Sequence, residues 1–360
     1  MVDGIFDSDY ITLLAGGTAP GRRLVLLDSG VPQVWRDRVV AYFSRYGVRA
    51  HVVVVPGGEP CKEGRVLWQI LDELRRFGLD RRNEPVIVIG GGAVLDVGGF
   101  AASIYRRGVP YLRVPTTLLA YVDASVGIKT GINLAGSKNL VGAFRPPIGV
   151  VLDRSFFTSL SDAQLSIGLG EVLKLGVGTD RLTFDLLDRY ADRVLRERFQ
   201  DRDGAQLLSR SVEVMLHELA GDLYEDELCR SVDLGHTFSQ PFEMRDDPLP
   251  HGHAVAVDVL ISCVLANERC LFTDAELARV LNVMQRLRMP LAPRRFAFEG
   301  IWDSLLDRVQ HRGGFQRVPL PERIGSCVFV NDVSPHELGH TVTRVCSFAF
   351  AEVEWADDAV

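Results

Sequence analysis

The sequence predicts an α/β N-terminal domain with a Rossmann-like, mostly parallel sheet, followed by a mainly α-helical domain. Strand and helix patterns alternate over residues 1–154, which is typical of a sheet covered by helices. The apolar run Val86–Ile89 leads directly into three glycines. After Asp153 long helical patterns dominate and strand patterns become scarce. We therefore expect two domains, residues 1–154 and 155–360.

The expected elements of the first domain follow one another at short intervals. The apolar run Arg23–Leu27 predicts a strand and ends at Asp28. Helical periodicity covers Trp35–Tyr46, and His51–Val55 and Tyr111–Val114 predict further strands. Because ligands of parallel sheets bind beyond the carboxyl ends of the strands, polar residues that follow these strands are candidate binding residues.

The glycines Gly90–Gly92 lie between a predicted strand and a small-residue helical segment. Glycines at such a turn let backbone amides approach a phosphate closely, and the helix N-terminus adds a favourable dipole. A lone glycine triplet would indicate only a tight turn. Downstream, Lys129, Lys138 and Asn139 lie among further glycines, and this pattern favours a phosphorylated or hydroxyl-rich ligand.

The second domain contains a carboxylate and two imidazoles that could bind a metal. Helical patterns cover Thr183–Arg198 and Gln206–Leu219. Glu171 lies in a helical stretch, and His236 and His251 each lie beside a glycine. These groups suit a divalent ion such as zinc and leave positions open for substrate oxygens. Their spacing alone does not establish a metal site. A strand pattern returns only at residues 327–330.

Composition and charge narrow the class of protein. With 360 residues and 47% hydrophobic content, the chain can bury a large core. Its net charge of -7 argues against nucleic-acid binding. We expect no signal peptide and no membrane span, since no basic region precedes an apolar run and no apolar run is long enough. Six cysteines without framework spacing indicate reduced thiols in a cytoplasmic protein.

Several motifs occur in order between residues 86 and 147. They are G-G-G-x-x-x-D, R-R-G, V-P-T-T, V-D-A-S-V-G-x-K-T-G-x-N and K-N-x-x-G-A-F. In this combination the chain resembles the sugar phosphate cyclases, the family that contains 3-dehydroquinate synthase, 2-deoxy-scyllo-inosose synthase and the sedoheptulose 7-phosphate cyclases. The resemblance covers most of residues 25–330.

The resemblance implies two cofactors, NAD and one divalent metal, zinc or cobalt. Residues that match the family's NAD site are Asp28, Glu59, Lys62, Gly91, Gly92, Asp96, Thr116, Thr117, Asp123 and Lys138. Residues that match its metal ligands are Glu171, His236 and His251. Implied catalytic and substrate-binding residues are Lys129, Lys174, Asn139, Asp233 and Arg107. The family's arginine of the R-G pair reaches a neighbouring subunit, which implies a homodimer with Arg107 acting in trans.

The resemblance also implies a reaction. NAD oxidises a substrate hydroxyl whose oxygen the metal polarises, and the neighbouring C–H becomes acidic. Phosphate then leaves by elimination, the hydride returns, and the ring opens and recloses by an intramolecular aldol step. NAD is therefore not consumed overall.

Departures from the family pattern bear on the substrate. Dehydroquinate synthases carry a lysine and an arginine at the places of Met215 and Cys229, and neither residue can bind a carboxylate. The V-D-L-G-H-T-F-S run with Asp233, together with Arg230 and the run ending at Asp258, resembles the sedoheptulose 7-phosphate cyclases that make 2-epi-5-epi-valiolone. The expected substrate is a ketose that is neutral apart from its phosphate.

Several alternatives remain open. Gln240 and His253 depart from the family pattern beside the expected metal, which leaves 2-epi-valiolone as another product of the same substrate. On a strand or turn, His253 would point away from His251. Arg312 is either a phosphate contact or a surface-loop residue. Other candidate functions are dehydroquinate or 2-deoxy-scyllo-inosose synthase, a metal-dependent alcohol or glycerol dehydrogenase, and a non-catalytic sugar phosphate sensor.

Overall fold

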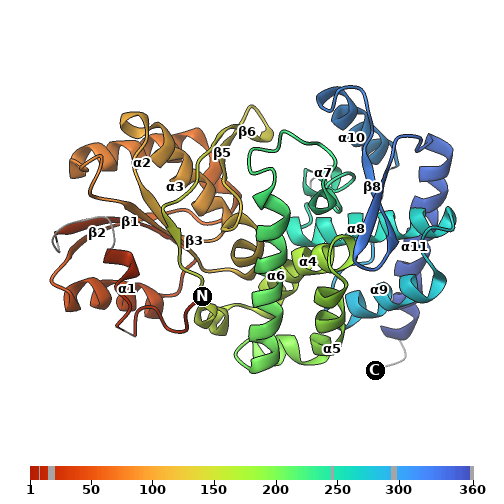
Figure 1. Cartoon of the computed structure of the whole chain (residues 1–360), viewed down its shortest axis with the longest axis horizontal. Helices are drawn as coiled ribbons and strands as arrows, with labels where there is room; N and C mark the ends of the chain where they lie inside the picture. The colour runs from red at the N-terminus through yellow and green to blue at the C-terminus, as the bar shows by residue number, and fades with distance from the viewer. Residues whose placement is uncertain (8, 15–20, 245–246, 293–297, 357–360) are drawn as a thin grey trace. The chain divides into compact units, whose positions relative to one another are not determined.

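A computed structural model describes residues 1–7, 9–14, 21–244, 247–292 and 298–356 (Figure 1). The chain forms two compact units, Met1–Ser161 and Asp162–Val360. The sequence prediction placed the boundary near residue 154, but the turn η5 (Arg154–Ser159) belongs to the first unit. Its Phe156 packs against Phe6 and Trp35, and these aromatic contacts hold the turn there.

The first unit is built on a five-stranded parallel sheet with the order β2-β1-β3-β4-β7. The strands are β1 (Arg22–Asp28), β2 (Arg49–Val55), β3 (Val86–Gly90), β4 (Tyr111–Pro115) and β7 (Gly149–Val150). From β1 the chain moves to β2 on one side, and it later continues to β4 on the other. The strand order therefore reverses between β1 and β3, where parallel sheets bind ligands at their carboxyl ends.

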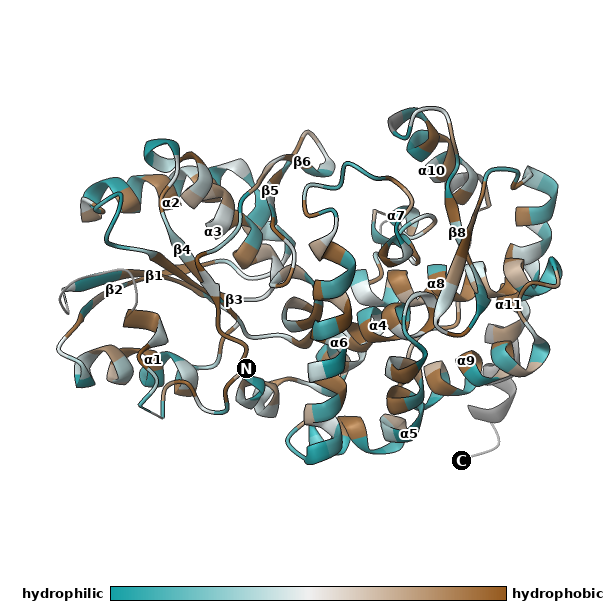
Figure 2. Cartoon of the chain, in the orientation of Figure 1, coloured by the Kyte–Doolittle hydropathy of each residue, from teal (hydrophilic) through white to brown (hydrophobic). Residues whose placement is uncertain are grey.

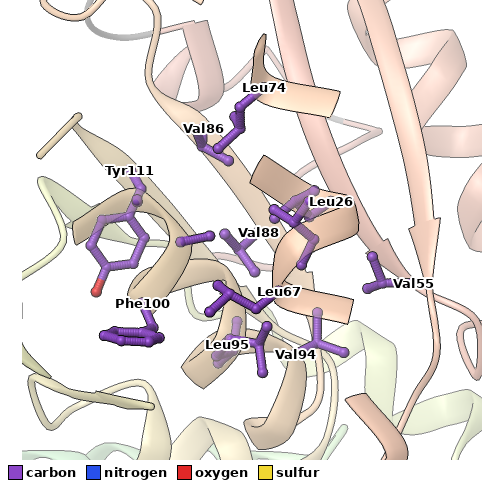
Figure 3. Close-up of a cluster of buried hydrophobic side chains, with 14 of the residues drawn as sticks. Leu26, Val55, Leu67, Leu74, Val86, Val88, Val94, Leu95, Phe100 and Tyr111 are labelled. Carbon is purple, nitrogen blue, oxygen red and sulfur yellow. The ribbon is translucent and has the colours of Figure 1, made fainter. Parts of the chain in front are cut away.

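Helices cover both faces of this sheet, α1 (Gln33–Arg45) on one and α2 (Gly64–Phe77) and α3 (Gly92–Ile104) on the other (Figure 1). Strands buried on both faces read as continuous apolar runs, and Figure 2 shows them as hydrophobic. Figure 3 shows Leu26 and Val88 of the strands packed with Leu67 of α2 and Val94 of α3. This core fixes the position of the glycine turn that opens α3.

An antiparallel hairpin, β5 (Lys129–Leu134) and β6 (Ser137–Phe144), packs on α3. The absence of a side chain at Gly99 allows this, because a Cβ there would lie 2.6 Å from Thr130 of β5. Short helical turns complete the unit: η1 (Thr12–Leu14), η2 (Glu59–Lys62), η3 (Tyr105–Arg107) and η4 (Ala120–Ala124). The hairpin brings its polar residues Asn133, Lys138 and Asn139 to η2.

The second unit is mainly helical, as the sequence predicts. Its helices are α4 (Asp162–Gly178), α5 (Arg181–Glu197), α6 (Arg202–Ala220), α7 (Gln240–Glu243), α8 (His251–Glu268), α9 (Asp274–Arg286), α10 (Phe298–His311) and α11 (Pro335–Ala356). The turn η6 (Ser231–Asp233) and the hairpin β8 (Val318–Arg323) and β9 (Ser326–Val330) complete it. Central α8 is buried over most of its length and packs against α4 and α11.

Strand β9 is where a strand was predicted, whereas its partner β8 was not. Pro319 and Pro321 lie inside β8, and proline argues against a strand because it cannot donate to the ladder. A two-stranded hairpin tolerates both prolines, since each strand is an edge. Within the described ranges, no helix has the length and apolar character needed to cross a membrane.

Candidate active site and metal centre

Three side chains of the second unit form a cluster that can hold a metal ion. Glu171 lies in the middle of α4, His236 follows η6, and His251 opens α8. Their ligand atoms all lie within 4.8 Å of one another. The Glu171 Oε1 atom is 3.3 Å from His251 Nε2 and 3.9 Å from His236 Nε2.

Glycines next to the three residues bring the backbones together. A Cβ on Gly170 would lie 2.0 Å from the carbonyl oxygen of Gly252, and a Cβ on Gly252 would lie 1.8 Å from that of Ile167. Helices α4 and α8 therefore touch backbone to backbone beside Glu171 and His251. Gly235, with φ of 81°, lets the His236 segment approach Val255 of α8.

The histidines present Nε2 toward the carboxylate. His251 Nδ1 lies 3.1 Å from Glu243 Oε1, and His236 Nδ1 lies 3.3 Å from the Leu234 carbonyl oxygen. A partner on Nδ1 fixes the tautomer in which Nε2 is available as a ligand. Burial lowers the pKa of His236 to about 3, so this imidazole is neutral. Against burial, hydrogen bonds with Glu171 and Glu243 raise the pKa of His251 to about 10.

Glu171 has the environment of a metal ligand. It is completely buried, with its Oε2 atom 2.5 Å from the ammonium of Lys174 and its Oε1 atom 3.3 Å from His251 Nε2. Burial opposes its ionisation, but Lys174 and the two imidazoles lower its pKa below the ordinary range. An ionised carboxylate that faces the Nε2 atoms of two imidazoles is a donor set that suits zinc. The residues present therefore fit a divalent metal.

The first unit contains a glycine turn organised by Asp28, at the point where the strand order reverses. Asp28 ends β1, and its carboxylate accepts hydrogen bonds from the amides of Gly30 at 2.7 Å and Gly91 at 3.0 Å. A Cβ on Gly90 would lie 2.7 Å from the Cβ of Asp28. Helix α3 begins at Gly92 with no side-chain cap. Its first amides are therefore suited to a phosphate.

Several predicted cofactor residues lie together beside this turn. The ammonium of Lys62 is buried and lies 2.6 Å from Asp96 Oδ2 and 2.7 Å from Asn139 Oδ1. Glu59 lies 3.9 Å from Lys138 and accepts a hydrogen bond of 2.9 Å from Asn133. Sequence reasoning missed Asn133, although it is the last residue of the K-T-G-x-N motif.

The remaining predicted residues of the first unit are more dispersed. Thr117 packs beside Gly91 and accepts a hydrogen bond from the amide of Ala120, and the amide of Thr116 bonds to Gly90. Asp123 lies in η4 and Lys129 opens β5. Arg107 is exposed at the end of η3, with a left-handed backbone.

Sequence reasoning also missed the buried Arg113, which holds the η4–β5 connection in place. Its guanidinium donates to the carbonyl oxygens of Ala124, Gly127 and Lys129.

Three arginines surround Asp233 in the second unit. Its carboxylate lies 2.7 Å from Arg230, 2.7 Å from Arg312 and 3.4 Å from Arg308. Burial opposes ionisation of Asp233, but these guanidiniums lower its pKa to about 2. Arg312 lies in the turn after α10, with its side chain mostly buried against Asp233. Sequence reasoning missed Arg308. Glu225 also lies 2.7 Å from Arg230, so three guanidiniums face two carboxylates, and the remaining positive charge suits an anion such as phosphate.

The structure also places the residues that depart from the family pattern. His253 lies on α8, not on the expected strand or turn, and its Nε2 is 3.0 Å from Ser166 Oγ. Gln240 opens α7 and donates to Met244 Sδ. Met215 is buried on α6, and Cys229 is exposed.

Comparison with known proteins identifies the family. The family model "3-dehydroquinate synthase N-terminal" matches residues 52–167, and "3-dehydroquinate synthase C-terminal" matches residues 168–308. The chain belongs to the 3-dehydroquinate synthase family. Members of this family differ in substrate, so individual relatives refine the comparison.

A 2-epi-5-epi-valiolone synthase of Streptomyces albus is 42% identical over 95% of this chain and 86% of its own length. A 3-dehydroquinate synthase of Pelobacter propionicus is 32% identical over 90% and 94%. Among solved structures, ValA, the 2-epi-5-epi-valiolone synthase of Streptomyces hygroscopicus with NAD+ and Zn2+ bound, matches with a TM-score of 0.92 and 36% identity. That match covers 96% of this chain and 95% of ValA.

Proposed function

We propose that this member of the 3-dehydroquinate synthase family is a sedoheptulose 7-phosphate cyclase, a carbon–oxygen lyase that forms 2-epi-5-epi-valiolone. The observation that carries the proposal is the Glu171–His236–His251 cluster, with the buried Glu171 and Lys174 beside it. The 42% identity to the Streptomyces albus 2-epi-5-epi-valiolone synthase favours this substrate class.

Two cofactors follow from the proposal. Glu171, His236 and His251 would hold zinc, which when bound polarises a substrate oxygen. The Asp28–Gly91 turn and the Lys62 cluster would hold NAD, which when bound accepts and returns a hydride. The zinc and NAD+ bound to ValA support both assignments.

The chain's own side chains have complementary roles in this proposal. Lys174 holds a buried positive charge beside the carboxylate ligand and favours negative charge on a substrate oxygen. Arg230 and Arg312 provide donors for a phosphate, and Asp233 keeps both guanidiniums in place. Lys129 and Asn139 are further substrate contacts in the proposal.

The residues at two positions favour a ketose phosphate over a substrate with a carboxylate. Met215 is buried and apolar, and Cys229 is exposed. Neither residue provides the cation with which dehydroquinate synthases bind their anionic substrate. Gln240 keeps the epimer 2-epi-valiolone as a second candidate product, since it departs from the family pattern beside His236.

The proposal is tested by incubating the purified chain with NAD, zinc or cobalt, and sedoheptulose 7-phosphate. We expect stoichiometric phosphate release without accumulation of NADH, and NMR couplings of the product identify the epimer. Net NADH accumulation would instead indicate a dehydrogenase. Phosphate release only from 3-deoxy-arabino-heptulosonate 7-phosphate would indicate a dehydroquinate synthase.

A further inference from the structure

Asp258 is a buried carboxylate that the reaction does not use directly. It lies on α8, two turns beyond His251, and is completely buried. Its carboxylate accepts a hydrogen bond from the amide of Phe238. The amides of Thr237 and Ser239 also donate to it. Three successive amides of the segment that follows His236 therefore converge on this one side chain.

Arg308 of α10 contacts the same segment. Its Nη1 donates a hydrogen bond of 2.5 Å to the carbonyl oxygen of His236, and its Nη2 lies 3.4 Å from Asp233 Oδ2. The guanidinium is largely buried. The peptide units that follow His236 are thus hydrogen-bonded to charged side chains from α8 and α10.

We infer that Asp258 and Arg308 are positioning residues that hold the His236 segment in the geometry required for metal binding. The segment has no regular secondary structure between η6 and α7. Side-chain contacts must therefore hold its backbone in place, because it lacks the repeated backbone hydrogen bonds of a helix or sheet. Gly235 adds a left-handed φ of 81°, a conformation that glycine permits but does not enforce. Without the two charged groups, His236 Nε2 would sample positions away from Glu171.

Asp258 and Arg308 each have the charge that their backbone partners favour: the carboxylate faces amide donors, and the guanidinium faces a carbonyl oxygen. Burial raises the pKa of Asp258 to about 7, while the backbone amides and Arg308 favour its ionised form. Amide donors require an acceptor, which the carboxylate supplies and a carboxamide supplies only in part. The side chain of Ser262 lies 3.4 Å from the same carboxylate, and its removal leaves the three amide contacts intact.

The test measures metal affinity in the full-length chain at about pH 8, above the pKa of about 7 to which burial raises Asp258. Zinc affinity is determined by competition with a chelator, and the d–d absorption of the cobalt-loaded protein reports ligand geometry. We expect Asp258→Asn and Arg308→Met each to weaken zinc binding by about 10–100-fold, the range typical of outer-shell partners, and to change the cobalt spectrum. Ser262→Ala is the matched control and should behave like the unmodified chain.

This inference rests on the proposed metal site, and the two can fail separately. If the unmodified chain bound no zinc, the proposed function and the inference would both be overturned. If the unmodified chain bound zinc and Arg308→Met, folded by circular dichroism, kept the same affinity and cobalt spectrum, only the inference would be overturned. Arg308 lies on α10 outside the central α4–α8 pair, so its variant keeps the test decisive if Asp258→Asn does not fold.

Discussion

At the scale of single residues, Glu171 decides whether the second unit can hold a metal. It supplies the one carboxylate of the three-residue cluster, and its buried Oε1 atom faces the Nε2 atoms of both histidines. We expect Glu171→Gln to abolish zinc binding and to reduce phosphate release at least about 1,000-fold, since metal polarisation contributes several kcal/mol. Metal analysis and a phosphate assay measure the two effects.

Glu243→Gln is the matched control for that variant. Glu243 contacts the Nδ1 atom of His251 and not the metal position. We expect it to keep zinc binding with an affinity weakened by about 10–100-fold. Equal loss of zinc in both variants would contradict the ligand role of Glu171.

Asp258 makes the stability of the folded chain depend on pH. Burial raises the pKa of Asp258 from 3.8 to about 7. Between these values the folded chain keeps a proton that the unfolded chain has released. The free energy of unfolding that this group contributes therefore falls as pH rises through the window, by at most about 1.4 kcal/mol per pH unit.

Asp258→Asn removes this titration. We expect the stability of the variant, relative to the unmodified chain, to rise between about pH 5 and pH 7. Urea unfolding of both proteins in EDTA measures the difference at each pH. A difference that stays constant across this range would show that Asp258 does not change its protonation on folding.

Sequence motifs indicated the candidate metal ligands better than they indicated the residues that hold the site in place. Glu171, His236 and His251 each lie in a local motif. Arg308 and Asn133 contact residues more than 70 positions away along the chain. Such contacts depend on how distant elements pack, so a motif can contain a residue, as K-T-G-x-N contains Asn133, without indicating its partner.

At the scale of elements, the contact between α4 and α8 depends on Gly170 and Gly252. A Cβ at either position would lie 2.0 Å or less from a backbone carbonyl oxygen. We expect Gly170→Ala and Gly252→Ala each to destabilise the apoprotein by about 1–3 kcal/mol or more and to weaken zinc binding, because the helices must separate. Thermal unfolding in EDTA and chelator competition measure both.

Gly64→Ala is the control for the glycine variants. Gly64 opens α2, and a Cβ there would meet nothing within 4 Å. We expect this variant to be neutral or stabilised by up to about 1 kcal/mol. If Gly170→Ala behaved in the same way, the backbone contact would not determine the site.

Helices and strands with a clear hydrophobic pattern could be predicted from the sequence, and those without such a pattern could not. The strands β1, β3 and β4 are buried apolar runs, and α5 and α6 have clear helical periodicity. The hairpin β5–β6 is rich in glycine and polar residues, so its strands lack the alternation that marks a half-buried strand. Its position becomes clear only from its packing on α3.

At the scale of the whole molecule, we expect a homodimer in which Arg107 serves the partner's site. Arg107 is exposed, which leaves it accessible to a second copy. Arg107→Ala and Glu171→Gln should each be nearly inactive as homodimers. A heterodimer of the two should recover about half of the unmodified activity, because one of its two sites is then complete.

Tandem affinity purification of differently tagged chains isolates this heterodimer, and phosphate release measures its activity. A mixture of the two homodimers that have not exchanged subunits is the control. An inactive heterodimer would contradict the trans arrangement and indicate that Arg107 acts within its own chain.

The three candidate ligands come from three separate segments of the second unit, in α4, after η6 and at the start of α8. A zinc ion bound to all three would cross-link those segments, so zinc binding and folding would be thermodynamically linked. Each tenfold rise in free zinc above the dissociation constant would then add about 1.4 kcal/mol to the stability of the folded chain. Since cells degrade unfolded chains continuously, zinc supply would set the abundance of this protein as well as its turnover rate.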